Sequence, residues 1–186
     1  MTETLPVTKS LQAAKIRGYR PADHGACRHL WAELIEHRSE LYGEAPAGES
    51  DAGAGFEEYL TQLNLSGMWV ADFPEVGVAG FIGLMLDGRT GEVDPVIVTA
   101  RLRGQGVGRA LLAKVADEAR RRGLRRLTIS PSVRDTSALR ALHTAGFGTV
   151  ATVTLSYDVP ASSGKRKAPS PVQESSLDLF DLRFDV

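Results

Sequence analysis

Three glycines within five residues, at the start of a helical pattern, constrain this chain more than any other stretch. Gly104, Gly106 and Gly108 lie between an apolar run at 93–99, which is rich in β-branched residues, and an amphipathic segment. A glycine-rich turn between a strand and a helix exposes consecutive backbone N–H groups, and the helix dipole adds partial positive charge there. Side chains would obstruct a bulky phosphate at this turn. The stretch 103–112 therefore predicts a cradle for a diphosphate.

Other glycine-rich turns fit less well. The P-loop pattern needs Gly-Lys-Ser/Thr after four intervening residues, and no lysine follows here. The dinucleotide pattern would need glycine at 109 or 111 and an early strand–helix–strand unit. A plain helix-entry loop is the structural alternative, but three glycines so close together would destabilise the beginning of a helix.

Hydrophobic periodicity and turn residues predict the other elements. A first helix is expected after Asp23 as its N-cap, and Cys27 is expected to pack on its apolar face. Residues 1–14 read as an N-terminal extension, 43–55 as a loop, and 160–176 as a flexible loop between the last two strands of a single domain. Further helices are predicted at 56–65, 107–122 and 135–145, and strands at 16–20, 68–72, 76–86, 92–99, 127–130, 150–159 and 177–186.

Two motifs and this element order resemble the GNAT N-acetyltransferase superfamily over most of the chain. Residues 103–108 fit the family's Arg/Gln-x-x-Gly-x-Gly/Ala pyrophosphate motif. The family's Asn-x-x-Ala-x-x-Leu-Tyr-x-x-x-Gly-Phe segment is matched by spacing at Asp135, Ala138, Ala141, Leu142, Gly146 and Phe147. The resemblance implies an α/β fold of order β-α-α-β-β-β-α-β-α-β-β around a mixed, mostly antiparallel sheet.

The resemblance also implies acetyl-CoA as co-substrate and assigns residues to it. Main-chain groups of Val96, Ile97 and Val98 would pair with the pantetheine arm, and one of their N–H groups would polarise the thioester carbonyl. Asp135 and Ala138 would lie on the helix beside the thiol. Arg101 or Arg109 would reach the ribose phosphate. The pyrophosphate would be held by Arg103, Gly104, Gln105, Gly106, Val107, Gly108, Arg109 and Ala110.

Acetyl transfer to an amine needs a base, because an alkylamine is mostly protonated at neutral pH. Glu92 lies where many family members keep a glutamate acting as base, and Asp94, two residues on, points to the same face. A solvated hairpin carboxylate is the alternative for Glu92. The family's tyrosine, often the general acid, is replaced by Leu142. His143 and Tyr157 are then the candidate acids, although a half-buried helix histidine without a role is the alternative for His143.

Composition limits the remaining functions. The net charge is −1, no apolar run approaches the ~20 residues of a membrane span, and the one cysteine, Cys27, suits the cytoplasm. The four histidines show no metal-ligand spacing, so no metal is expected. Residues 31–60 are rich in acidic side chains and residues 101–126 in basic ones. Either these charges lie on solvated helix faces, or the acidic segment serves a cationic acceptor and the basic segment a polyphosphate cofactor. A pI near 6.4 without interleaved aromatic residues argues against nucleic-acid binding.

The sequence therefore predicts a cytoplasmic N-acetyltransferase that moves an acetyl group to a primary amine of a small-molecule or peptide acceptor. Direct attack in a ternary complex is expected, with no membrane or nucleic-acid partner. A non-catalytic acyl-CoA sensor is the alternative, because the tyrosine is missing. A homodimer is compatible with the resemblance.

Overall fold

The structure is a computed structural model that describes residues 14–43, 51–62, 65–152 and 154. The chain divides into two compact units, Met1–Ser130 and Pro131–Val186. Among these described residues, the sheet belongs to the first unit and helix α4 to the second.

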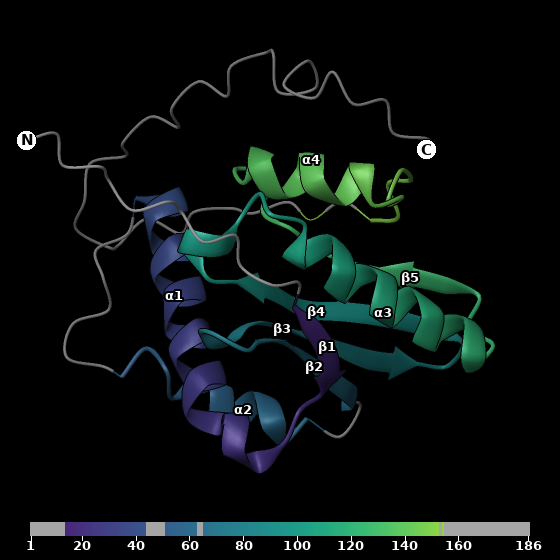
Figure 1. Ribbon diagram of the computed structural model, residues 1–186. Coiled ribbons are helices and arrows are strands. Elements are labelled where there is room, and N and C mark those ends of the chain that lie inside the picture. The colour runs from purple at the N-terminus through teal and green to yellow at the C-terminus, as the bar shows by residue number, and fades with distance from the viewer. Residues whose placement is uncertain (1–13, 44–50, 63–64, 153, 155–186) are drawn as a thin grey trace, which may run out of the picture. The chain divides into compact units, whose positions relative to one another are not determined.

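The described part of the first unit is built on one five-stranded sheet with the order β1-β2-β3-β4-β5 (Figure 1). The first four strands form an antiparallel meander, and β5 joins the edge of β4 in parallel. A strand–helix–strand crossover makes that parallel pairing possible. The predicted mixed, mostly antiparallel sheet is confirmed. Its strands are β1 (Lys15–Gly18), β2 (Leu65–Phe73), β3 (Gly77–Asp87), β4 (Thr90–Val98) and β5 (Arg126–Thr128).

Helices α1 (His24–Tyr42) and α2 (Gly55–Leu60) cover one face of the sheet. Their buried side chains join those of three strands in one apolar cluster, which excludes water from that face. Aromatic rings dominate it, and the Phe56 and Phe81 centroids lie 5.6 Å apart. The buried members are Cys27, Leu30, Phe56, Tyr59, Met68, Val70, Phe81 and Ile97.

Helix α3 (Val107–Arg121) covers the opposite face. Trp69 lies between two members of the α1–α2 cluster in β2, so its side chain points the other way. There Lys114 Nζ lies 5.9 Å from the centroid of the Trp69 ring. The apolar stripe predicted for this helix is confirmed, because Val107, Leu111, Val115 and Ala119 are all buried.

A bulge interrupts β4 halfway along its length. Val93 pairs with Leu84 and Val96 with Ile82, so Asp94 and Pro95 together face the single residue Gly83. Gly83 has no room for a side chain, because an added Cβ would collide with the Tyr59 hydroxyl oxygen. That hydroxyl donates a 2.8 Å hydrogen bond to the Asp94 carbonyl oxygen.

Two local predictions need correction. The helix predicted at 56–65 ends at Leu60, where Thr61 N–H bonds back to the Glu58 carbonyl, and Leu65 already begins β2. Asp23 precedes α1 as predicted, but its carboxylate does not cap the helix. It binds the Arg17 guanidinium at 2.7 and 2.8 Å instead, because a charged partner is a stronger donor than a helix N–H.

In the second unit, α4 (Thr136–Thr144) matches the helix predicted at 135–145. Residues 150–152 and 154 are not in a strand, and the rest of the strand predicted at 150–159 lies outside the described residues. So do the strand at 177–186, the loop at 160–176 and nearly all of the N-terminal extension. Within the described ranges, no helix is long and apolar enough to cross a membrane.

Candidate active site

The glycine turn joins the end of β4 to α3 through a short 3-10 turn, η2 (Ala100–Leu102). Gly104 and Gly106 have φ angles of 74° and 84°, in the left-handed region that residues with a side chain rarely adopt. Gly108 has ordinary helical geometry, and an added Cβ would lie 3.8 Å from Val98 Cγ2, a normal contact. Backbone conformation therefore requires glycine at two of the three positions.

The first turn of α3 presents unpaired donors. Helical bonding begins only with Ala110 N–H, which donates to the Gly106 carbonyl, and no side chain caps this end. Among the described residues, the N–H groups of Val107, Gly108 and Arg109 have no acceptor. The first turn holds no acidic residue. This geometry and charge suit an anion.

Beyond the β5 pairing, one edge of β4 is open. Strand β5 pairs only with Thr90–Glu92, so within the described chain 93–98 has a strand partner on one side only. Thr99 N–H donates to the Ala79 carbonyl of β3, and residues of an antiparallel strand alternate in the edge they address. The main-chain groups of Val96 and Val98 therefore point outward, and those of Ile97 point to β3.

The side chain of Arg103 contacts this open edge. Arg103 Nε donates a 3.1 Å hydrogen bond to the Val98 carbonyl oxygen, which fixes that carbonyl outward. Pro95 has no N–H to offer, so Val96 N–H is the first donor on the open edge after the bulge. Of the three predicted pantetheine residues, Val96 and Val98 are thus placed to pair with an extended ligand, and Ile97 is not.

Two carboxylates lie beside that edge, on the face that carries α1 and α2. Asp94 is opposite Gly83 in the bulge, and Glu92 alternates with the buried Val93. Glu92 is exposed and Asp94 is half-buried. Burial raises the pKa of the Asp94 carboxyl above its ordinary value, and the Arg38 guanidinium partly offsets this. The arrangement can accept a proton next to the open edge.

The support for this edge was missed in the sequence. Tyr59 is 3% exposed, and its hydroxyl holds the bulge from α2. A glycine inside an apolar strand, opposite a strand proline, is the signal that could have indicated a bulge with a close approach. Nothing in the pattern of residues 56–65 singled out the tyrosine.

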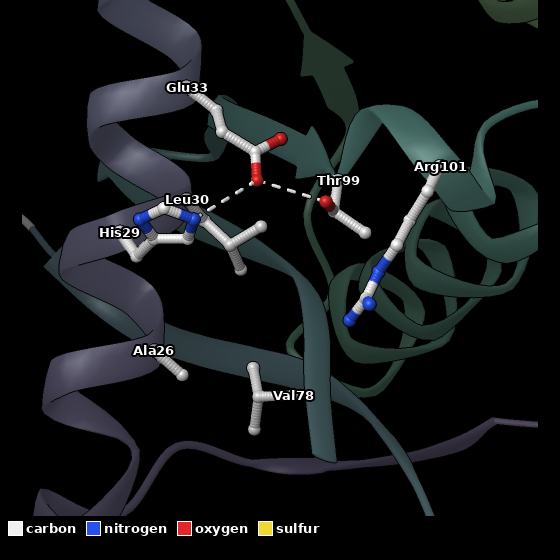
Figure 2. Close-up of a pocket in the computed structure, with 7 residues that line it drawn as sticks. All are labelled: Ala26, His29, Leu30, Glu33, Val78, Thr99 and Arg101. Atoms are coloured by element: carbon white, nitrogen blue, oxygen red, sulfur yellow. Dashed lines mark hydrogen bonds and ion pairs between the residues drawn. The ribbon is translucent and has the colours of Figure 1, made fainter. Parts of the chain in front are cut away.

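A cavity of about 350 Å³ opens between α1 and the end of β4, and a second of the same volume adjoins it. Figure 2 shows Glu33 of α1 bonded to Thr99 across the first cavity, with His29 beside it and the Arg101 side chain opposite. Among the described residues the Arg101 guanidinium has no ion-pair partner. Arg101 thus faces the α1 side, while Arg109 is exposed in the first turn of α3.

The second unit holds the remaining predicted residues. Asp135 is the N-cap of α4, and its carboxylate accepts a 2.9 Å hydrogen bond from Ala138 N–H. Leu142, at the family's tyrosine position, is 6% exposed and packs as a core residue. His143 is half-buried in the last turn. Tyr157, the other candidate acid, lies outside the described residues.

The basic end of α3 is internally paired. Arg120 pairs with Asp117, and both Arg121 and Arg122 pair with Glu118. The hydrogen bond from Arg122 lowers the pKa of the Glu118 carboxyl below its ordinary value. These contacts account for the arginines without a bound polyanion.

Known proteins share this fold. The structure matches a transcriptional regulator from Bacillus halodurans with a TM-score of 0.58 at 20% identity, covering 77% of this chain and 99% of that one. It matches aminoglycoside N-acetyltransferase AAC(6')-Iy in complex with CoA with a TM-score of 0.57 at 20% identity, covering 82% and 99%. Glucosamine-6-phosphate N-acetyltransferase from Arabidopsis thaliana gives a TM-score of 0.54 at 17% identity, covering 78% and 99%.

At these identities the likeness shows the fold alone. A search of curated protein sequences finds no significant match. A family model described as the acetyltransferase (GNAT) family matches residues 24–147, which is more than half of the 186 residues. The matched range includes β4, the glycine turn and α4. The chain therefore belongs to the acetyltransferase (GNAT) family.

Proposed function

We propose that this protein transfers an acetyl group from acetyl-CoA to a primary amine of a small-molecule or peptide acceptor, by direct attack in a ternary complex. One observation carries the proposal. The unpaired N–H groups of the α3 first turn adjoin the open edge of β4, so a ligand with a diphosphate and an extended amide arm finds donors for both.

Acetyl-CoA supplies the activated acyl group, and the chain supplies orientation, a donor and a base. Val96 N–H would donate to the thioester carbonyl oxygen as negative charge develops there. Glu92, directly or through a water, would take the proton that the attacking amine loses. Asp94 shares that face and is the second candidate for the same role. The departing thiol has a pKa near that of cysteine, ~8.5, so its protonation does not require a dedicated acid.

A cationic acceptor is part of this proposal. Residues 31–60 carry eight acidic side chains against one arginine, and α1 and α2 lie on the same face as Glu92 and Asp94. An acidic surface attracts an ammonium group before it loses its proton. That AAC(6')-Iy acts on aminoglycosides, which are polyamines, supports this class of acceptor without identifying it.

The test is consumption of acetyl-CoA against a panel of amines that includes polyamines, aminoglycosides, amino sugars and amino acids. The wild type should turn over at least one, and Glu92→Gln should lose most of the rate while still binding coenzyme A. Asp94→Asn is the companion variant. If Asp94→Asn loses the rate and Glu92→Gln keeps it, the base is Asp94. No turnover with any amine, together with intact cofactor binding, would contradict the enzymatic proposal.

A non-catalytic acyl-CoA sensor is the second candidate, and the buried Leu142 at the tyrosine position favours it. The same variants separate the two functions. In a sensor, Glu92→Gln and its companion Asp94→Asn would leave every measurable activity unchanged.

A further inference from the structure

Glu33 connects α1 to the chain segment that leads into the glycine turn. Its Oε1 atom accepts a 2.9 Å hydrogen bond from the Thr99 hydroxyl, and its Oε2 atom accepts a 3.1 Å hydrogen bond from Ala100 N–H. Both carboxylate oxygens are thus engaged, 66 and 67 residues away along the chain. The Glu33 side chain is 22% exposed, so the contact is partly shielded from water.

The two residues that Glu33 holds are the hinge between β4 and the cradle. Thr99 follows the last residue of β4, and Ala100 begins η2. From there the hydrogen bonds are short-range and Leu102 is buried: Leu102 N–H donates to the Thr99 carbonyl, and Gln105 Nε2 donates to the Arg101 carbonyl. Among the described residues, the other side-chain hydrogen bonds of the stretch 98–105 are local.

Glycines in this turn give it little stiffness of its own. Gly104 and Gly106 cost more conformational entropy to order than other residues would. A bidentate carboxylate anchored in a 19-residue helix removes some of that freedom before any ligand arrives. The anchor comes from α1, on the opposite face of the sheet from α3, so it adds a constraint that α3 does not supply.

We propose that Glu33 is a positioning residue for the cofactor: it fixes the start of η2, and through it the unpaired N–H groups of the glycine turn, in the conformation that receives the diphosphate. The inference rests on the proposed function for the identity of the ligand. Glu33 touches neither cofactor nor reacting atoms, so its loss should weaken the binding of coenzyme A and raise the KM for acetyl-CoA. The kcat at saturating cofactor should stay nearly unchanged.

The experiment compares Glu33→Ala with Glu36→Ala by calorimetric titration of coenzyme A. Glu36 lies one turn further along α1, is exposed and lines the adjoining cavity, so its loss removes the same charge without breaking this contact. We expect about tenfold weaker binding for Glu33→Ala, the loss of roughly one charge-assisted hydrogen bond. Glu36→Ala should match the wild type in affinity for coenzyme A.

Glu33→Gln is the rescue variant, because the amide oxygen can still accept from Ala100 N–H and the amide NH₂ can donate to the Thr99 oxygen. It should recover most of the affinity. Thr99→Val tests the other end of the contact if Glu33→Ala folds poorly, and should weaken binding in the same direction. Equal affinities of Glu33→Ala and wild type, or equal weakening by Glu36→Ala, would overturn the inference. A wild type that does not bind coenzyme A would instead refute the proposed function.

Discussion

At the scale of single residues, the three glycines of the cradle have different reasons to be there. Gly106 adopts a φ of 84°, in the left-handed region. Gly108 is helical, and a side chain there would meet its neighbours at ordinary van der Waals distances. Alanine at 106 would hold a strained left-handed conformation, at a cost of roughly 1–2 kcal/mol. Alanine at 108 would make a normal contact with Val98 and favour the helix.

We therefore predict that Gly106→Ala lowers the free energy of unfolding by about 1 kcal/mol or more, while Gly108→Ala leaves it unchanged or raises it. Urea denaturation of both variants and the wild type measures this. Equal destabilisation by the two substitutions would show that the strain has been assigned to the wrong position.

Cys27 offers a second test at this scale. It is fully buried in the α1–α2 cluster, and burial raises the pKa of its thiol to about 12. A neutral, inaccessible thiol reacts slowly, as the sequence-based expectation of a packing role implies. We predict that a thiol-alkylating reagent modifies the native protein at pH 7 at least ~100-fold more slowly than the protein unfolded in urea. Comparable rates in both states would contradict that packing.

The glycines and Glu92 could be singled out as candidates from the sequence, because each belongs to a local pattern. Glu33 could not, because its partners are more than sixty residues away and α1 carries other exposed glutamates that look the same. Which of them turns toward β4 depends on how α1 packs on the sheet. Spacing along one helix does not contain that information.

At the scale of elements, β4 carries most of what the site needs, and its shape depends on α2. The Tyr59 hydroxyl lies over Gly83 and donates a hydrogen bond to the Asp94 carbonyl, so a side chain of α2 fixes the bulge and the open edge after it.

Tyr59→Phe keeps the ring and removes only this hydrogen bond. We predict a loss of about 1 kcal/mol in unfolding free energy and a reduced kcat, because Val96 N–H and Asp94 would be less well fixed. Unchanged kcat with the expected loss of stability would limit Tyr59 to a structural role.

Ion pairs join β1 to β2 and to the residue that precedes α1. Arg17 of β1 binds Asp23 at 2.7 Å and Asp72 of β2 at 2.8 Å, and the Asp23 side chain is nearly buried. The hydrogen bonds from Arg17 lower the pKa of the Asp23 carboxyl and raise that of the guanidinium. A carboxyl with a lowered pKa stabilises the fold above its unfolded value of about 3.9 and loses that contribution as the pH falls through the folded value.

Asp23→Asn should accordingly destabilise the protein by about 3 kcal/mol at pH 7, because it leaves a partly buried arginine with one fewer carboxylate. The difference between variant and wild type should shrink as the pH drops below about 4. Chemical denaturation at a series of pH values measures both. A difference that stays constant down to pH 2 would contradict the assignment.

The order of the elements up to α4 and the pairing of β3 with β4 could be predicted, because alternation, turns and the Asp87–Thr90 hairpin are features of short stretches of sequence. The end of α2 could not be placed, because Leu65 continues the apolar pattern of that helix although it pairs with Met85 in the sheet. Tertiary pairing overrode local periodicity there.

At the scale of the whole molecule, the open edge of β4, the first turn of α3 and the acidic helices α1 and α2 belong to one unit, and we propose that together they receive an acyl donor and an amine. The family match over residues 24–147 supports acetyl transfer, while the acceptor stays a proposal. The basic segment 101–126 is not equally available to a ligand along its length. Arg120, Arg121 and Arg122 at the end of α3 pair with Asp117 and Glu118, whereas the start of that helix carries unpaired N–H groups and the exposed Arg109.

We propose that the unpaired amides of the α3 first turn hold a diphosphate. Calorimetric titration of the unmodified protein with coenzyme A and with pantetheine, which lacks the diphosphate and nucleotide, tests it without any mutation. Two charge-assisted hydrogen bonds alone predict at least ~100-fold tighter binding of coenzyme A at low ionic strength, and added salt should narrow the difference. Equal affinities for the two ligands, or no affinity for coenzyme A, would show that these amides do not hold a diphosphate.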